Sequence, residues 1–185
     1  QVVFTMRPLD KIFPSTYQQG LKSGGKRTYE EWLELVLADY ASAQRTAFWG
    51  RNRYAQVLNR WIEVFGSENV TLVTTDETNP AVMYSRMEQV ASLAPGTLVA
   101  SVSTGLNRSL LLDEIELVRQ INLLIPRQRS WNEYLTFVRK GVTEPLSSVV
   151  ADKSKPTDRL RTPAAFAARI AEIAKIELAE LQMLD

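Results

Sequence analysis

The stretch Gln1-Val-Val-Phe-Thr-Met-Arg-Pro-Leu-Asp-Lys-Ile-Phe-Pro-Ser-Thr-Tyr-Gln-Gln-Gly-Leu21 predicts a strand that leads into a helix, with a cation at the junction. The β-branched and aromatic run at 2–5 favours a strand, which ends before Arg7. Pro14 suits the first turn of a helix that reaches about Leu21, because its missing N–H costs nothing there. A strand followed by a helix is typical of an α/β fold.

The polar residues of this stretch predict an anion site. Open α/β sheets bind ligands outside the carboxyl ends of their strands, where a helix N-terminus also attracts anions. Arg7 would offer a phosphate a planar, permanently charged fork, and Ser15 with the first amides of the helix would offer neutral donors. For the pair alone, a second interpretation is equally good: Arg7 is a solvated cation at the strand end, and Ser15 is part of the first turn of the helix.

The chain begins inside a strand pattern, at Gln1 rather than at a methionine. A lone strand that carries a ligand site normally has neighbours in a sheet. We therefore expect part of the sheet to lie upstream of this sequence.

Composition restricts the class of protein. The 185 residues, of which 45% are hydrophobic and 23% charged, predict a single globular domain over 1–185. A net charge of +1 argues against a nucleic-acid surface. No apolar run approaches the roughly 20 residues of a membrane span, and no signal peptide is visible, so we expect a cytoplasmic protein. The absence of cysteine and histidine excludes disulfides, thiolate chemistry and an imidazole base within these residues.

Helical periodicity dominates the rest of the chain. Asn69 to Thr74 alternates as a second strand, which gives a strand, helix, strand order and a parallel sheet, followed by a mostly helical C-terminal half. Trp49 and Trp61 fit helical spacing, which favours core positions over a sugar-stacking role. The polar stretch at 152–157 predicts a loop that joins two packed helices. Capping signals and apolar spacing predict helices at about 28–40, 54–65, 80–93, 110–125, 131–138 and 163–184.

The segment from Val2 to Tyr17 resembles the 3′-phosphate-binding segment of P-loop sulfotransferases, which use 3′-phosphoadenosine 5′-phosphosulfate (PAPS). In that family a strand ends in an arginine, a short turn with Asp or Lys follows, and a serine stands eight residues after the arginine. Arg7 and Ser15 match this spacing, which is the specific part of the resemblance. Later segments are similar, in the same order along the chain, to segments of bacterial members of the family. These are Tyr29–Leu33, Phe48–Trp61, Asn69–Thr74 and the stretch from Asn107–Leu110 to Arg119–Asn122.

The resemblance implies an α/β, P-loop-NTPase-like fold, with a three-layer parallel sheet flanked by helices. It implies a sulfotransferase that moves a sulfuryl group from PAPS to an acceptor hydroxyl and releases adenosine 3′,5′-bisphosphate. Arg7 and Ser15 would then hold the 3′-phosphate, without any metal. The acceptor would be a small molecule or a hydroxyl of a carbohydrate or lipid.

Two catalytic parts of the family have no counterpart among these residues. The P-loop lysine and the usual histidine base belong upstream of the first strand, so this chain is expected to supply the 3′-phosphate half and the helical acceptor side. The family's strand motif Tyr-Glu-Asp is replaced by Thr74-Thr-Asp-Glu77. Asp76 or Glu77 could act as a base, although a carboxylate after a strand is more often solvated or a helix cap.

Two further segments have competing interpretations. Phe137–Gly141 is similar to the family's C-terminal Arg-Lys-Gly loop, but its helical spacing favours a plain helix end. Ser23–Lys26 could cradle a phosphate, yet it follows a helix rather than a strand, which favours a plain loop. A different class of function also remains: a non-catalytic α/β module that senses a nucleotide or mediates an interaction.

Overall fold

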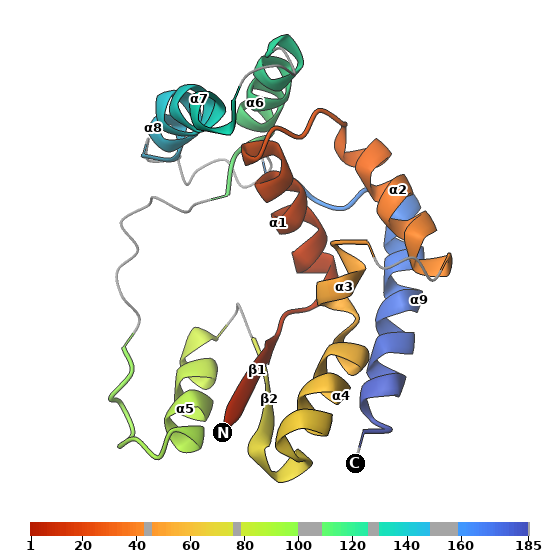
Figure 1. Cartoon of the computed structure of the whole chain (residues 1–185), viewed down its shortest axis with the longest axis vertical. Coiled ribbons are helices and arrows are strands. Elements are labelled where there is room, and N and C mark those ends of the chain that lie inside the picture. Colours follow the sequence, from red (N-terminus) through yellow and green to blue (C-terminus); the bar gives the residue numbers. More distant parts are fainter. Residues whose placement is uncertain (43–45, 76–78, 100–108, 126–129, 149–158, 185) are drawn as a thin grey trace. The chain divides into compact units, whose positions relative to one another are not determined.

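The computed structural model describes residues 1–42, 46–75, 79–99, 109–125, 130–148 and 159–184. They form a mixed, mostly helical α/β chain with two compact units (Figure 1). The first unit comprises Gln1–Lys11, Val36–Val102 and Ala165–Asp185, and the second comprises Ile12–Leu35 and Ser103–Ala164. The expectation of a single domain stays a prediction.

A parallel pair of strands forms the centre of the first unit (Figure 1). Strand β1 (Val2–Met6) pairs with β2 (Val70–Thr74), with Val2 opposite Val70 and Met6 opposite Thr74. These are the two strands present in the described residues. The predicted strand positions and their parallel pairing are confirmed, and both strands end at the same edge.

Helix α4 (Tyr54–Phe65) packs beside the strands because its apolar residues recur at helical spacing. The ring of Tyr54 meets that of Phe4 on β1 edge-on, at a centroid distance of 6.2 Å. The helix ends where predicted, at Gly66, whose φ of 81° is accessible to glycine and whose N–H donates to the Ile62 carbonyl. The other helices of this unit are the second half of α2 (Tyr29–Ala41), α3 (Trp49–Asn52), the 3₁₀ turn η1 (Ser67–Asn69), α5 (Pro80–Val90) and most of α9 (Ala164–Leu181).

The two tryptophans at helical spacing have different environments. Trp49 is buried, its indole N–H donates to the Val36 carbonyl at 2.6 Å, and its ring meets Tyr40. Trp61 is 42% exposed and stacks on Phe65, which is also exposed. The predicted core position is therefore confirmed for Trp49 and wrong for Trp61, because helical spacing does not tell which face of α4 is covered.

Helix α1 (Leu9–Lys22) begins earlier than predicted. Its first turn starts directly after Pro8, whose carbonyl accepts from the Lys11 N–H at 3.0 Å, and Asp10 in that turn favours the helix N-terminus. Pro14 therefore lies inside the helix rather than at its start. Pro8, together with Asp10, therefore marks the start of the helix.

The second unit is helical and is organised around buried Asn122. The Asn122 amide nitrogen donates to the carbonyls of Leu21 and Gly25, each at 2.8 Å, and its oxygen accepts from the Tyr134 hydroxyl at 2.9 Å. Besides most of α1 and the first half of α2 (Tyr29–Ala41), the described helices are α6 (Leu112–Leu124), α7 (Trp131–Tyr134), the π-helix η2 (Leu135–Thr143) and α8 (Glu144–Ser148).

Candidate functional site

A pocket of about 210 Å³ lies at the carboxyl ends of the two strands, within the first unit. This is the edge at which α/β sheets bind ligands. Met6 and Arg7 reach it from the end of β1, and Thr74 from the end of β2. The full lining is Met6, Arg7, Pro8, Leu9, Tyr54, Thr74, Ala174, Glu177, Leu178 and Leu181.

Hydrogen bonds fix the backbone at the strand end. The Met6 carbonyl accepts from the Thr75 N–H at 2.8 Å and from the Thr75 hydroxyl at 3.2 Å. The Arg7 carbonyl accepts from the Tyr54 hydroxyl at 2.6 Å. Burial raises the pKa of Tyr54 to about 12, although its hydrogen bond to Arg7 opposes that shift. Tyr54 therefore stays protonated near neutral pH and keeps donating to the backbone of half-buried Arg7.

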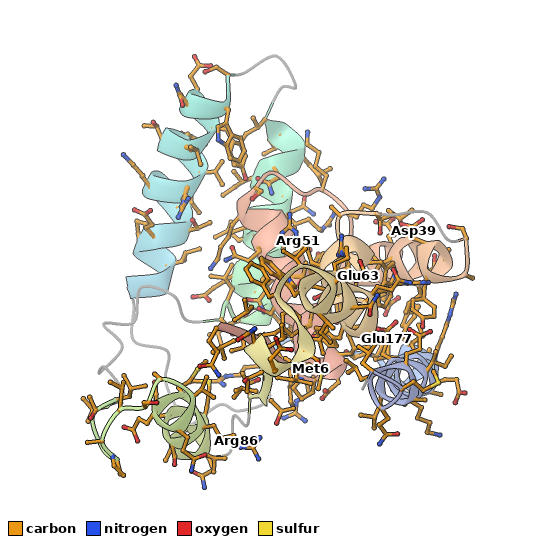
Figure 2. The ribbon with its side chains drawn as sticks, turned by 60° about the horizontal axis from the view of Figure 1, so that its bottom comes forward. Met6, Asp39, Arg51, Glu63, Arg86 and Glu177 are labelled. Carbon is orange, nitrogen blue, oxygen red and sulfur yellow. The ribbon has the colours of Figure 1, made fainter. Side chains whose placement is uncertain are left out.

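Glu177 on α9 is the acidic residue of the pocket, and only 2% of it is exposed. Figure 2 shows it on the side of α9 toward the strand end that carries Met6. Its Oε1 accepts from the Tyr40 hydroxyl at 3.1 Å, whereas Oε2 has no hydrogen-bond partner within the described part of the chain. Burial raises the pKa of Glu177, and nearby Glu180 adds to the rise, while hydrogen bonds from Tyr40 and from the Tyr54 backbone, together with the charge of Arg53, oppose it.

Sequence reasoning missed Glu177 although its position carried a signal. Ile170, Ile173 and Glu177 follow one another at steps of three and four residues, so they share one face of α9, and all three are buried. Ile176, which is three residues after Ile173 and also apolar, is 41% exposed. A carboxylate that continues an apolar helical face is the sign that could have identified this residue.

Ser15, the other predicted phosphate-binding residue, lies in the interior of α1 and is half-buried. It belongs to the second unit, whereas Arg7 belongs to the first. The expectation that Ser15 stands in the first turn of the helix is wrong, because α1 begins at Leu9. The first amides of the helix follow Arg7 directly.

The glycine-containing loop at 23–26 uses its amides to end α1. The N–H groups of Ser23 and Gly25 donate to the Gly20 carbonyl, and that of Gly24 donates to the Leu21 carbonyl. Gly24 has a φ of 91°, as glycines that follow a helix often do. Lys26 donates to the Ile125 carbonyl at 3.2 Å. These contacts agree with the predicted plain loop rather than with a phosphate cradle.

The remaining candidates divide between described and undescribed residues. Phe137–Gly141 lies inside η2 and continues into α8, so the predicted helix end is wrong there. Asp76 and Glu77, like the predicted loop at 152–157, lie outside the described residues. Among the residues that the structure does describe, no group of three or more acidic side chains could hold a metal ion, and no helix has the length and apolar character to cross a membrane.

No protein-family model, no curated protein and no solved structure matches this chain. The case for a function therefore depends on the residues of the chain and on the strand-end pocket.

Proposed function

We propose that this chain is part of a PAPS-dependent sulfotransferase and supplies the half that binds the 3′-phosphate, together with the helical side that faces the acceptor. Its fold would be the three-layer, P-loop-NTPase-like sheet of that family, with β1 and β2 as two of the strands. The observation that carries the proposal is the position of Arg7, which directly follows β1 at the carboxyl edge of a parallel pair and lines a pocket there.

The chemistry of this strand end suits a phosphate. A guanidinium can form two parallel hydrogen bonds to phosphate oxygens and keeps its charge at any physiological pH. The N-terminus of the 14-residue helix α1 begins two residues after Arg7, so its dipole adds positive potential at the same strand end. The Tyr54 hydrogen bond to the Arg7 carbonyl limits movement of the backbone from which the guanidinium extends.

The proposal divides the reaction between parts of the enzyme. In-line sulfuryl transfer needs a base for the acceptor hydroxyl and positive groups at the bridging oxygen. The 185 residues contain no histidine, so we assign to this chain the nucleotide's 3′-phosphate, held by Arg7 and Ser15, and one side of the acceptor site. The base and the 5′-phosphosulfate contacts are assigned to other parts of the enzyme.

Calorimetric titration with adenosine 3′,5′-bisphosphate tests the role of Arg7. The variant Arg7→Ala should weaken binding at least about tenfold, because a hydrogen bond to a charged group contributes roughly 1.5–3 kcal/mol. Arg7→Lys keeps the positive charge but loses the two parallel donors of the guanidinium, so its affinity should lie between those of the wild type and Arg7→Ala. Arg51→Ala, which removes an exposed arginine of the same unit outside the pocket, is the matched control and should bind like the wild type. Equal binding by wild type and Arg7→Ala would refute the proposed role.

A second titration and a transfer assay separate the enzyme from the non-catalytic alternative. Ser15→Ala should weaken nucleotide binding by a smaller factor, about two- to tenfold, as expected for one neutral hydrogen bond. Sulfate transfer from PAPS to a panel of phenols, sugars and lipid alcohols is then measured with the complete protein. Nucleotide binding that depends on Arg7 without any transfer would favour a nucleotide-sensing module.

A further inference from the structure

A second arginine stands at the carboxyl edge of the strand pair. Arg86 lies on α5, which packs beside β2, and its Nη1 donates to the Thr74 hydroxyl oxygen at 3.3 Å. Thr74 is the last residue of β2 and lines the strand-end pocket. Figure 2 shows Arg86 on the side of α5 toward the strands. The hydrogen bond to Thr74 therefore holds a guanidinium at the end of β2, just as Arg7 follows the end of β1.

The register of the two strands brings both arginines to one place. Met6 pairs with Thr74, and neighbouring strands of a sheet lie about 5 Å apart. Arg7 directly follows Met6, and the Arg86 guanidinium contacts Thr74. An arginine side chain is longer than the spacing between two strands, so both guanidinium groups can reach one ligand that lies over the two strand ends. These residues all belong to the first unit.

The donors of Arg86 are accessible to a ligand. Arg86 and Thr74 are exposed, and Thr74 accepts from one of the five N–H donors that a guanidinium has. In the part of the chain that the structure describes, none of the ion pairs involves Arg86. Glu177, the acidic residue of the pocket, is buried, and burial raises its pKa, which shifts the carboxyl toward the uncharged form. The strand ends therefore present positive charge to solvent.

A terminal phosphate has more acceptor atoms than the fork of one arginine can bind. It offers three oxygens and carries about 1.5 to 2 negative charges at neutral pH. The parallel N–H groups of one guanidinium bind two oxygens and balance one charge. A second guanidinium supplies donors for the third oxygen and balances the remaining charge. A pair of arginines at one strand edge therefore suits a terminal phosphate better than a carboxylate, which has two oxygens and one charge.

We propose that Arg86 is a second binding residue for the 3′-phosphate of the nucleotide, and that Thr74 positions its guanidinium beside that of Arg7. The inference rests on the proposed function for the identity of the ligand, and it adds a specificity-determining residue that the resemblance does not include. The two arginines together select a nucleotide with a terminal 3′-phosphate over one with a free 3′-hydroxyl.

Calorimetric titration of the complete protein with two nucleotides tests the role of Arg86. Adenosine 3′,5′-bisphosphate carries the 3′-phosphate, and adenosine 5′-phosphate lacks it. Arg86→Ala should weaken binding of the bisphosphate at least about fivefold, because it removes a charge-assisted hydrogen bond. The same variant should leave binding of adenosine 5′-phosphate unchanged. Arg51→Ala, which removes an exposed arginine of the same unit outside the pocket, should bind both nucleotides like the wild type.

The outcomes separate this inference from the proposed function. A loss of bisphosphate affinity in Arg7→Ala but not in Arg86→Ala would overturn the role of Arg86 and leave the proposed function in place. Equal losses for the two nucleotides in Arg86→Ala would also overturn it, because the arginine would then contact a part of the nucleotide other than the 3′-phosphate. A wild-type protein that binds no bisphosphate would refute both.

Thr74 is tested as a positioning residue. Thr74→Val removes the hydroxyl that accepts from Arg86 and keeps the shape of the side chain, so bisphosphate binding should weaken about two- to fivefold. Thr74→Ser keeps the hydroxyl and should bind like the wild type. In the Arg86→Ala background, Thr74→Val should have no further effect. A loss in that background as large as in the wild type would contradict the proposed link between the two residues.

Discussion

Each unit of the chain contains a buried polar side chain that accepts a hydrogen bond from a tyrosine hydroxyl, Asn122 in the second unit and Glu177 in the first. The two side chains differ in how many of their polar atoms have partners. In the second unit, both amide atoms of Asn122 are hydrogen-bonded, to Leu21, Gly25 and Tyr134. In the first unit, Glu177 has Tyr40 at one oxygen and no partner within the described residues at the other. A satisfied buried group stabilises the fold, whereas a buried oxygen left without a partner costs free energy.

The largest effect is expected at Asn122. Asn122→Leu leaves the Leu21 and Gly25 carbonyls without the amide donor and the Tyr134 hydroxyl without the Asn122 oxygen. The Gly25 carbonyl loses its side-chain donor, whereas the Leu21 carbonyl keeps the Tyr134 hydroxyl and the Gly24 N–H. A buried group left unsatisfied costs about 1–3 kcal/mol, so the free energy of unfolding should fall by about 2–3 kcal/mol. Urea denaturation monitored by circular dichroism measures this value. A loss below about 1 kcal/mol would show that Asn122 does not organise the second unit.

Removal of either tyrosine hydroxyl, Tyr40 or Tyr134, should lower the free energy of unfolding by a smaller amount than Asn122→Leu. Tyr40→Phe leaves Glu177 without its hydrogen-bond donor, and we expect a loss of about 1–2 kcal/mol together with a further rise in the Glu177 pKa. Tyr134→Phe leaves Asn122 with its two carbonyl contacts, so the expected loss is about 1 kcal/mol. Paired denaturation curves compare the two, and a larger loss for Tyr134→Phe would reverse the comparison.

The smallest expected effect is a change with pH in the free energy of unfolding, caused by the Glu177 carboxyl group. Because the folded state raises its pKa above the ordinary 4.5, Glu177 contributes stability that is present below that value and is lost as the pH rises through the folded pKa. The charged or titratable neighbours of this carboxyl are Tyr40, Arg53, Tyr54 and Glu180.

Glu177→Gln removes that dependence, because glutamine does not ionise. Relative to the wild type, the variant should gain stability at pH 8 and change little at pH 4. Denaturation midpoints from pH 4 to pH 8 give the comparison, with Glu172→Gln as the exposed control. A variant that loses stability as the pH rises, relative to the wild type, would show that the carboxylate is stabilised rather than penalised by its surroundings.

Local patterns predicted those parts of the fold that depend on neighbours in sequence. Strands β1 and β2 and the end of α4 at Gly66 follow from alternation, helical spacing and the conformational freedom of glycine. The start of α1 was misjudged because two prolines, Pro8 and Pro14, both suit a helix start. Only the hydrogen bond from Lys11 to the Pro8 carbonyl distinguishes them.

The site was predicted in part. Arg7 at a strand end could be identified from the sequence, because a cation after an apolar run needs no tertiary information. Glu177 was missed, because its spacing from Ile170 and Ile173 shows that the three share a helix face but not that this face is buried next to the strand end, far away in sequence. The π-helical form of η2 was also missed, because residues spaced for an α-helix gave no sign of the wider turns.

The most direct test of the proposed function is a crystal structure of the complete protein with adenosine 3′,5′-bisphosphate. The account predicts that the 3′-phosphate lies at the carboxyl end of β1, within hydrogen-bonding distance of the Arg7 guanidinium, and that Ser15 donates to the same phosphate. A nucleotide bound elsewhere, with its 3′-phosphate away from Arg7, would contradict it.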